Sequence, residues 1–153
     1  MLAPRRPLAT KFKYRLLYLG DDLKLITALR KELADADCRV VACSDHGSAI
    51  LFLKSDIPYQ ELLIDWEWRG REGLELARLV HTLKHRSDLT PMLVAATKLT
   101  RYMEAAAHKA GIRECIIKTK DMAEVIKVTS RSMSGTASQL TQGLSSADGP
   151  SHG

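Results

Sequence analysis

Short apolar runs alternate with amphipathic segments along most of the chain. Strand-length apolar runs cover residues 14–19, 39–43, 62–64, 91–96 and 114–117. Between them, apolar side chains recur every three or four residues, which is the period of an amphipathic helix. Continuous apolar strands that alternate with helices are typical of a parallel sheet covered on both faces. The pattern therefore predicts a single doubly wound α/β domain.

Helix start and stop signals support this prediction. Asp45 is placed to cap the second helix, and that helix stops before Pro58. The third helical pattern starts at Gly73 and follows a glycine-bearing loop. The fourth ends at Gly111, because glycine tolerates the left-handed conformation that often terminates a helix. A fifth helix follows Asp121.

Composition sets the domain limits. The chain has 153 residues, of which 45% are apolar and 27% charged, so one domain with a sizeable core is expected. Residues 1–13 form a basic arm that we expect to be flexible, and 14–133 form the domain. Residues 134–153 are rich in serine and glycine, so we expect a disordered tail or a linker. No apolar run reaches the ~18 residues of a membrane span, and no signal peptide is evident, so we expect a cytoplasmic protein.

Charge and cysteine content exclude other classes. The net charge is +5, but much of it lies in the N-terminal arm, so we expect no nucleic-acid partner. The three cysteines are odd in number and sit in apolar or strand-like segments. They predict reduced core thiols rather than disulfides or a metal site: Cys38, Cys43 and Cys115.

Charged residues follow three of the predicted strands. Asp21 and Asp22 follow the first strand, Asp65 ends the third, and Lys118 follows the last. The carboxyl ends of parallel strands lie at one edge of the sheet, where open α/β sheets build their sites. Carboxylates crowded at this edge would repel one another unless a hard cation neutralised them, and oxygen ligands of this kind suit Mg²⁺.

This arrangement resembles the receiver domains of response regulators over residues 14–133. The segment from Leu62 to Leu74 matches their phospho-acceptor region position for position, and the acidic residues and Lys118 fall in register with it. The resemblance implies a flavodoxin-like (βα)5 fold with a five-stranded parallel sheet in the order 2-1-3-4-5.

The resemblance also implies roles for the residues at the strand ends. Asp65 would accept a phosphoryl group, and Lys118 would neutralise that group. Asp21, Asp65 and the backbone carbonyl of Glu67 would bind Mg²⁺, with Asp22 contributing through a water molecule. The domain would act as a signalling module rather than an enzyme. A histidine kinase or phosphotransfer protein would be its donor, and an unidentified protein would receive the signal.

Four positions depart from the family pattern. Gly20 replaces the first acid, Ala96 the switch hydroxyl, Cys115 the switch aromatic, and Thr119 the proline after the lysine. The first three favour an alternative, in which the domain is a degenerate receiver that binds proteins independently of phosphorylation. The intact Asp21, Asp65 and Lys118 argue against this alternative. A flavin or nucleotide binder on the same fold is disfavoured, because the acids after the first strand would repel phosphate.

Overall fold

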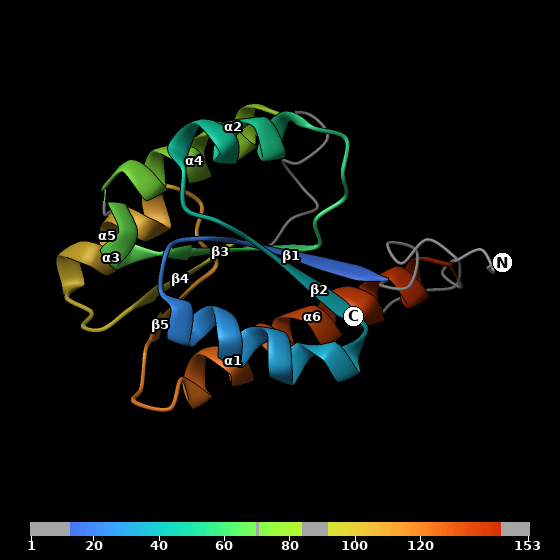
Figure 1. Cartoon of the computed structure of the whole chain (residues 1–153). Coiled ribbons are helices and arrows are strands. Elements are labelled where there is room, and N and C mark those ends of the chain that lie inside the picture. The colour runs from blue at the N-terminus through green and yellow to red at the C-terminus, as the bar shows by residue number, and fades with distance from the viewer. Residues whose placement is uncertain (1–12, 70, 84–91, 145–153) are drawn as a thin grey trace, which may run out of the picture.

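The computed structural model describes residues 13–69, 71–83 and 92–144, and its centre is a five-stranded parallel sheet (Figure 1). The strand order is β2-β1-β3-β4-β5, which confirms the predicted flavodoxin-like topology. The strands are β1 (Tyr14–Leu19), β2 (Cys38–Cys43), β3 (Glu61–Asp65), β4 (Met92–Ala96) and β5 (Glu114–Ile117).

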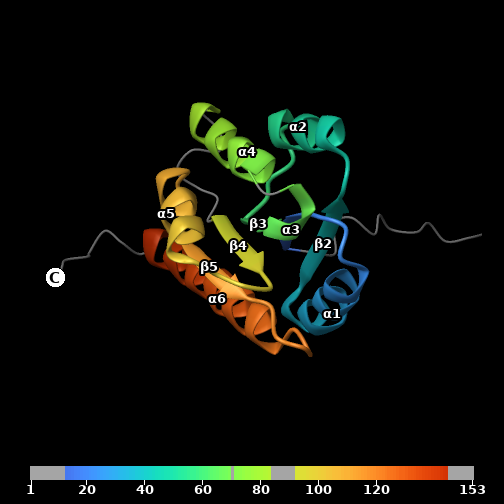
Figure 2. The same ribbon diagram turned by 90° about the vertical axis from the view of Figure 1, so that its left-hand side faces the viewer.

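Helices cover both faces of the sheet. Figure 1 shows α2 and α4 with α5 on one face and α1 and α6 on the other, and Figure 2 views the molecule from the side where the short helix α3 lies. The helices are α1 (Leu23–Leu33), followed by a 3₁₀ turn (Ala34–Ala36), α2 (His46–Lys54), α3 (Trp66–Arg69), α4 (Arg71–Thr82), α5 (Arg101–Lys109) and α6 (Ala123–Leu144).

The sheet separates two apolar cores. The strands are apolar on both faces, so each layer of helices can bury its own stripe against them. Leu17, Leu62 and Val94 face the α2/α4/α5 layer, whereas Leu16 and Leu63 face α1 and α6. This packing fixes the strand ends, and with them the edge that carries the charged residues.

Capping side chains set the helix ends. Asp22 caps α1 through the amides of Lys24 and Leu25, and Asp45 caps α2 as predicted. Gly111 lies just after α5 with φ of 89°, which confirms the predicted left-handed stop. Each carboxylate cap satisfies backbone donors that the first helical turn leaves free.

Two elements differ from the sequence prediction. The predicted loop after Asp65 contains α3, because the Asp65 side chain accepts a hydrogen bond from the Glu67 amide and turns the chain at once into a helix. Helix α6 continues to Leu144, past the boundary predicted at residue 133. Low apolar content argued against burial there, but a helix needs only its own backbone hydrogen bonds to continue. Residues 1–12 and 145–153, and Pro91 of the predicted fourth strand, lie outside the described residues.

Two further features bear on the sequence analysis. Cys38, Cys43 and Cys115 are free thiols, and burial raises the pKa of Cys38 to about 12. Within the described ranges, no helix has the length and apolar character needed to cross a membrane.

Candidate functional site

Four of the predicted site residues meet at the carboxyl edge of the sheet. Asp65 is the last residue of β3, Asp22 caps α1, Glu67 lies in α3, and Lys118 follows β5. These segments are far apart in the sequence, and the parallel pairing of β1, β3, β4 and β5 brings them together. The prediction that this edge gathers charged groups is therefore correct.

Lys118 lies between three carboxylates. Its Nζ is 2.7 Å from Asp65 Oδ2, 3.0 Å from Asp22 Oδ2 and 3.1 Å from Glu67 Oε1. Burial alone would lower the pKa of Lys118, but hydrogen bonds to the carboxylates outweigh it and hold this pKa above its usual range. The ammonium is therefore charged at neutral pH and is the central cation of the cluster.

Asp65 is buried, with only 1% of its surface exposed, and both of its carboxylate oxygens accept hydrogen bonds. Oδ2 accepts from the Tyr18 hydroxyl at 2.5 Å and from Lys118 Nζ, and Oδ1 accepts from the Glu67 amide at 3.1 Å. Burial raises the pKa of Asp65, while the hydrogen bonds from Lys118 and Tyr18 favour its charged form. The carboxylate is enclosed by groups of the protein itself.

Tyr18 is a site residue that the sequence analysis missed. Its side chain is fully buried in β1, and its hydroxyl also accepts a hydrogen bond from the Asp22 amide at 3.2 Å. Burial, followed by the hydrogen bond to Asp65, raises the pKa of Tyr18, so the phenol stays protonated. The sequence analysis assigned residues 14–19 only to a strand, but a tyrosine in a buried strand needs a partner for its hydroxyl, and this signal could have pointed to Tyr18.

Gly20 explains how the phenol reaches Asp65. A Cβ atom at Gly20 would lie 2.6 Å from Tyr18 Cζ and 2.7 Å from Asp65 Cβ, which is closer than Cβ contacts occur. Any side chain here would collide with both residues. The missing first acid of the family pattern is thus coupled to the tyrosine two residues earlier, whose ring fills the space.

The remaining predicted positions lie around this centre. Asp21 is exposed, so Lys118 pairs with its neighbour Asp22 instead. Ala96 is buried, and the amide of the next residue, Thr97, donates to Glu67 Oε2 at 2.9 Å. Cys115 is half-buried in β5. The described chain has no cis peptide bond, so the Lys118–Thr119 peptide is trans.

The arrangement does not fit Mg²⁺. Among the described residues, no three or more His, Cys, Asp or Glu side chains are placed to hold a metal ion. The Lys118 ammonium pairs with Asp65 and Asp22, and the Tyr18 hydroxyl also binds Asp65 Oδ2, so both groups compete with a cation for these carboxylates. The predicted ligand set of Asp21, Asp65 and the Glu67 carbonyl stays a prediction that this geometry does not support.

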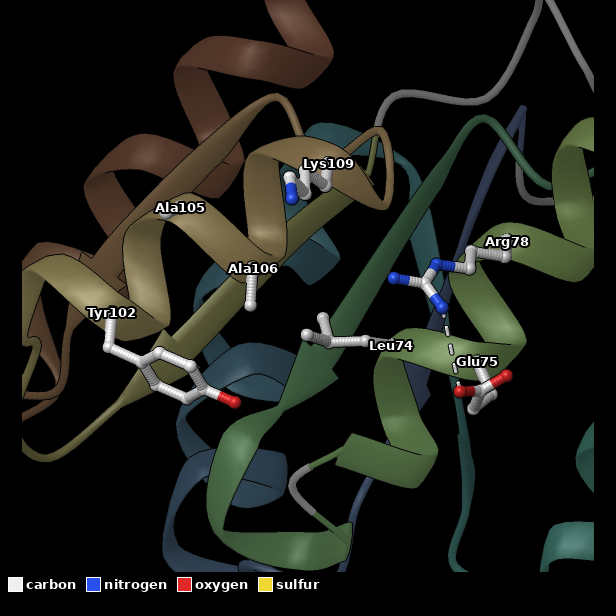
Figure 3. Close-up of a pocket in the computed structure, with 7 residues that line it drawn as sticks. All are labelled: Leu74, Glu75, Arg78, Tyr102, Ala105, Ala106 and Lys109. Carbon is white, nitrogen blue, oxygen red and sulfur yellow. Dashed lines mark ion pairs between the residues drawn. The ribbon is translucent and has the colours of Figure 1, made fainter.

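A separate groove lies between α4 and α5, and Figure 3 shows Leu74 and Ala106 facing each other across it. Its volume is about 440 Å³. The rim carries Arg78 and Glu75, which form an exposed ion pair at 3.6 Å and so offset each other's charge. The groove contains none of the predicted site residues.

Sequence comparisons identify no relative, because no protein-family model and no curated protein matches the chain. Solved structures do match. A response regulator from Thermotoga maritima is 17% identical with a TM-score of 0.67, and the match covers 79% of this chain and 98% of that one. The chemotaxis response regulator of Vibrio cholerae is 16% identical with a TM-score of 0.67, over 78% and 98% of the two chains.

A third match is the receiver domain of a sensor histidine kinase from Pseudomonas aeruginosa, whose structure has a magnesium ion in its active-site cleft. It is 16% identical with a TM-score of 0.64, and the match covers 79% of this chain and 98% of that domain. These matches agree with the strand order of the sheet. The chain therefore has the fold of response-regulator receiver domains.

Proposed function

We propose that this chain is a receiver-type signalling module that acts by binding other proteins, without phosphoryl transfer to Asp65. The observation that carries the proposal is the state of Asp65, which is buried and has both carboxylate oxygens bonded to Tyr18, Lys118 and the Glu67 amide. Phosphoryl transfer needs an oxygen that can be approached in line by the donor. Both oxygens of Asp65 already accept hydrogen bonds, and these compete with such an approach.

Freeing the carboxylate would cost more than one hydrogen bond. Bonds to charged groups contribute about 1.5–3 kcal/mol each, and Oδ2 accepts two of them. Displacement of the Asp65 carboxylate would also remove one ion-pair partner from Lys118, whose side chain is largely buried. The arrangement in which Asp65 is bonded to Tyr18, Lys118 and the Glu67 amide is therefore favoured. We expect a partner protein to bind the surface around it.

Incubation with acetyl phosphate and Mg²⁺, followed by intact mass measurement, tests this proposal. We expect the mass of the wild-type chain to stay unchanged, and beryllofluoride to leave its tryptophan emission unchanged. Asp65→Asn serves as the matched control, because it removes only the acceptor oxygen. A phosphoryl increment in the wild type that disappears in Asp65→Asn would overturn the proposal.

A second candidate is phosphorylation of Asp65 by a histidine kinase or a phosphotransfer protein, with Mg²⁺ as cofactor. The specific observation in its favour is the 2.7 Å contact between Lys118 Nζ and Asp65 Oδ2, since this pair holds the positions that the receiver resemblance assigns to acceptor and neutralising cation. It requires the Tyr18 hydrogen bond to break first. Both candidates make the chain a signalling protein rather than an enzyme, with an output protein still to be identified.

A further inference from the structure

At the position where a metal ion would bind Asp65, two groups of the protein bind its carboxylate instead. The ammonium of Lys118 and the hydroxyl of Tyr18 both bind Asp65 Oδ2, at 2.7 and 2.5 Å. We infer that Tyr18, together with Lys118, is a built-in substitute for the divalent cation and ties the β1–α1 loop to the end of β3. The inference rests on the proposed function, because it names what keeps the same site closed.

The Tyr18 hydroxyl joins two segments. It donates to Asp65 Oδ2 at the end of β3 and accepts from the Asp22 amide at 3.2 Å, next to the start of α1. We call this pair of hydrogen bonds the Tyr18 bridge. A hydroxyl has one proton to donate and lone pairs to accept, so the bridge uses it in both directions. A cation could attract the carboxylate, but it could not accept from the amide.

Gly20 shows that the bridge is built into the backbone. The ring of Tyr18 passes where a side chain at residue 20 would start, as the 2.6 Å approach to its Cζ shows. An acid at this position and the Tyr18 bridge exclude each other. A buried carboxylate at this position can be balanced either by a metal ion bound with the help of a further acid, or by the Tyr18 bridge and Lys118. This chain has the second arrangement.

The effect of Asp65→Asn on stability distinguishes these two arrangements, because the two predict changes of opposite sign. If Asp65 lay among other acids without a counter-charge, Asp65→Asn would relieve repulsion and stabilise the protein. Here Asp65 is balanced by Lys118 and bonded by Tyr18, so the same substitution removes attractive interactions. A buried carboxylate with its partners in place should therefore contribute to folding.

Thermal melting of a double-mutant cycle tests the inference. Wild type, Tyr18→Phe, Asp65→Asn and the double variant are melted in EDTA and in millimolar Mg²⁺. We expect both single variants to melt at lower temperature, and Tyr18→Phe to lower the Tm less in the Asp65→Asn background, because the two groups interact directly. Mg²⁺ should leave the wild-type Tm unchanged. Tyr14→Phe is the control, since it removes a hydroxyl from the other end of β1.

A higher Tm for Asp65→Asn, or additive effects of the two substitutions, would overturn the inference. An Asp65-dependent rise in the wild-type Tm with Mg²⁺ would do the same. If Tyr18→Phe does not fold, the Mg²⁺ arm and Asp65→Asn still decide. The proposed function is tested by a different readout, the phosphoryl mass increment. If the wild type gains this mass while the double-mutant cycle gives the expected Tm values, the proposed function is wrong and the Tyr18 bridge stands.

Discussion

At the scale of single residues, the chain buries two carboxylates at opposite ends of β3 and treats them differently. Asp65 has Lys118 and Tyr18 as partners, whereas burial raises the pKa of Glu61 to about 8, although Ser132 and Arg113 favour its charged form. Glu61 is fully buried at the start of the strand. It is therefore neutral at pH 7, while Asp65 is held by an ion pair.

Glu61 predicts a loss of stability as the pH rises from about 4.5 to about 8. Its pKa rises from 4.5 to about 8 on folding, so its stabilising effect is complete below pH 4.5 and is lost as the pH approaches 8. The loss is on the order of 3–5 kcal/mol across this window. Urea unfolding at several pH values measures it, and Glu61→Gln should flatten the slope and be more stable than wild type at pH 8. An unchanged slope in the variant would mean that Glu61 is ionised in the folded chain.

We expect removal of the Lys118 charge to lower the free energy of unfolding by a large amount. Lys118→Met leaves Asp65 buried without its ion partner, which typically costs about 3–5 kcal/mol. Chemical denaturation gives the difference in unfolding free energy. Lys120→Met is the matched control, because Lys120 is exposed two residues away and should change stability little. Equal effects of the two substitutions would contradict the central role of Lys118.

At the scale of elements, glycines decide where helices stop and how closely they pack. Gly111 has φ of 89° after α5, and Gly73 in α4 lies so close to β3 that a Cβ would be 2.8 Å from Ile64 Cγ2. Gly47 in α2 has no such restriction, since its nearest neighbour would lie at 3.5 Å. The same substitution should therefore have opposite effects at different glycines.

Alanine substitutions test this difference. Gly111→Ala places a Cβ in the left-handed region and against the His81 ring, and should cost at least about 1–2 kcal/mol. Gly47→Ala lies in a helix with room for the methyl group, and should stabilise by about 0.5–1 kcal/mol. Comparison of the two Tm values checks the prediction. A stabilising Gly111→Ala would show that the α5 stop has another conformation in solution.

The sequence predicted the regular elements well because their signals are local. The apolar run of β1, the cap at Asp45 and the stop at Gly111 can each be recognised within a few residues. The Tyr18 bridge could not be predicted, because it joins residues 47 positions apart and depends on how β1 and β3 pair. Helix α3 was missed for a similar reason, since it starts from the side-chain conformation of Asp65.

At the scale of the whole molecule, one sheet serves two cores. Every strand contributes to packing in the described chain, so neither helical layer can separate without exposing the apolar face it covers. The charged groups lie at the carboxyl edge of the sheet, where Lys118 forms ion pairs with Asp65 of β3, Glu67 of α3 and Asp22, the cap of α1. Lys118 therefore links these three segments at this edge of the sheet.

The shared sheet predicts cooperative unfolding. Trp66 and Trp68 pack against the core on the α2/α4/α5 side, and Trp68 Nε1 donates to Ser44 O at 3.0 Å, so their fluorescence reports on that layer. Far-UV circular dichroism reports on the helices of both layers. We expect the two urea transitions to coincide, as they do in two-state domains. Separate midpoints would show that the layers unfold independently.

The cluster around Lys118 also sets the local field at this end of the molecule. Asp22, Asp65 and Glu67 carry three negative charges against one ammonium, and the side chains of Asp22 and Glu67 are 24% and 42% exposed. Although the chain as a whole has a net charge of +5, these four groups together carry a net charge of −2, and we expect this local charge to slow the approach of anions. Acetyl phosphate is itself an anion. Incubations at low and high ionic strength will therefore separate slow encounter, which salt relieves, from an enclosed acceptor, which it does not.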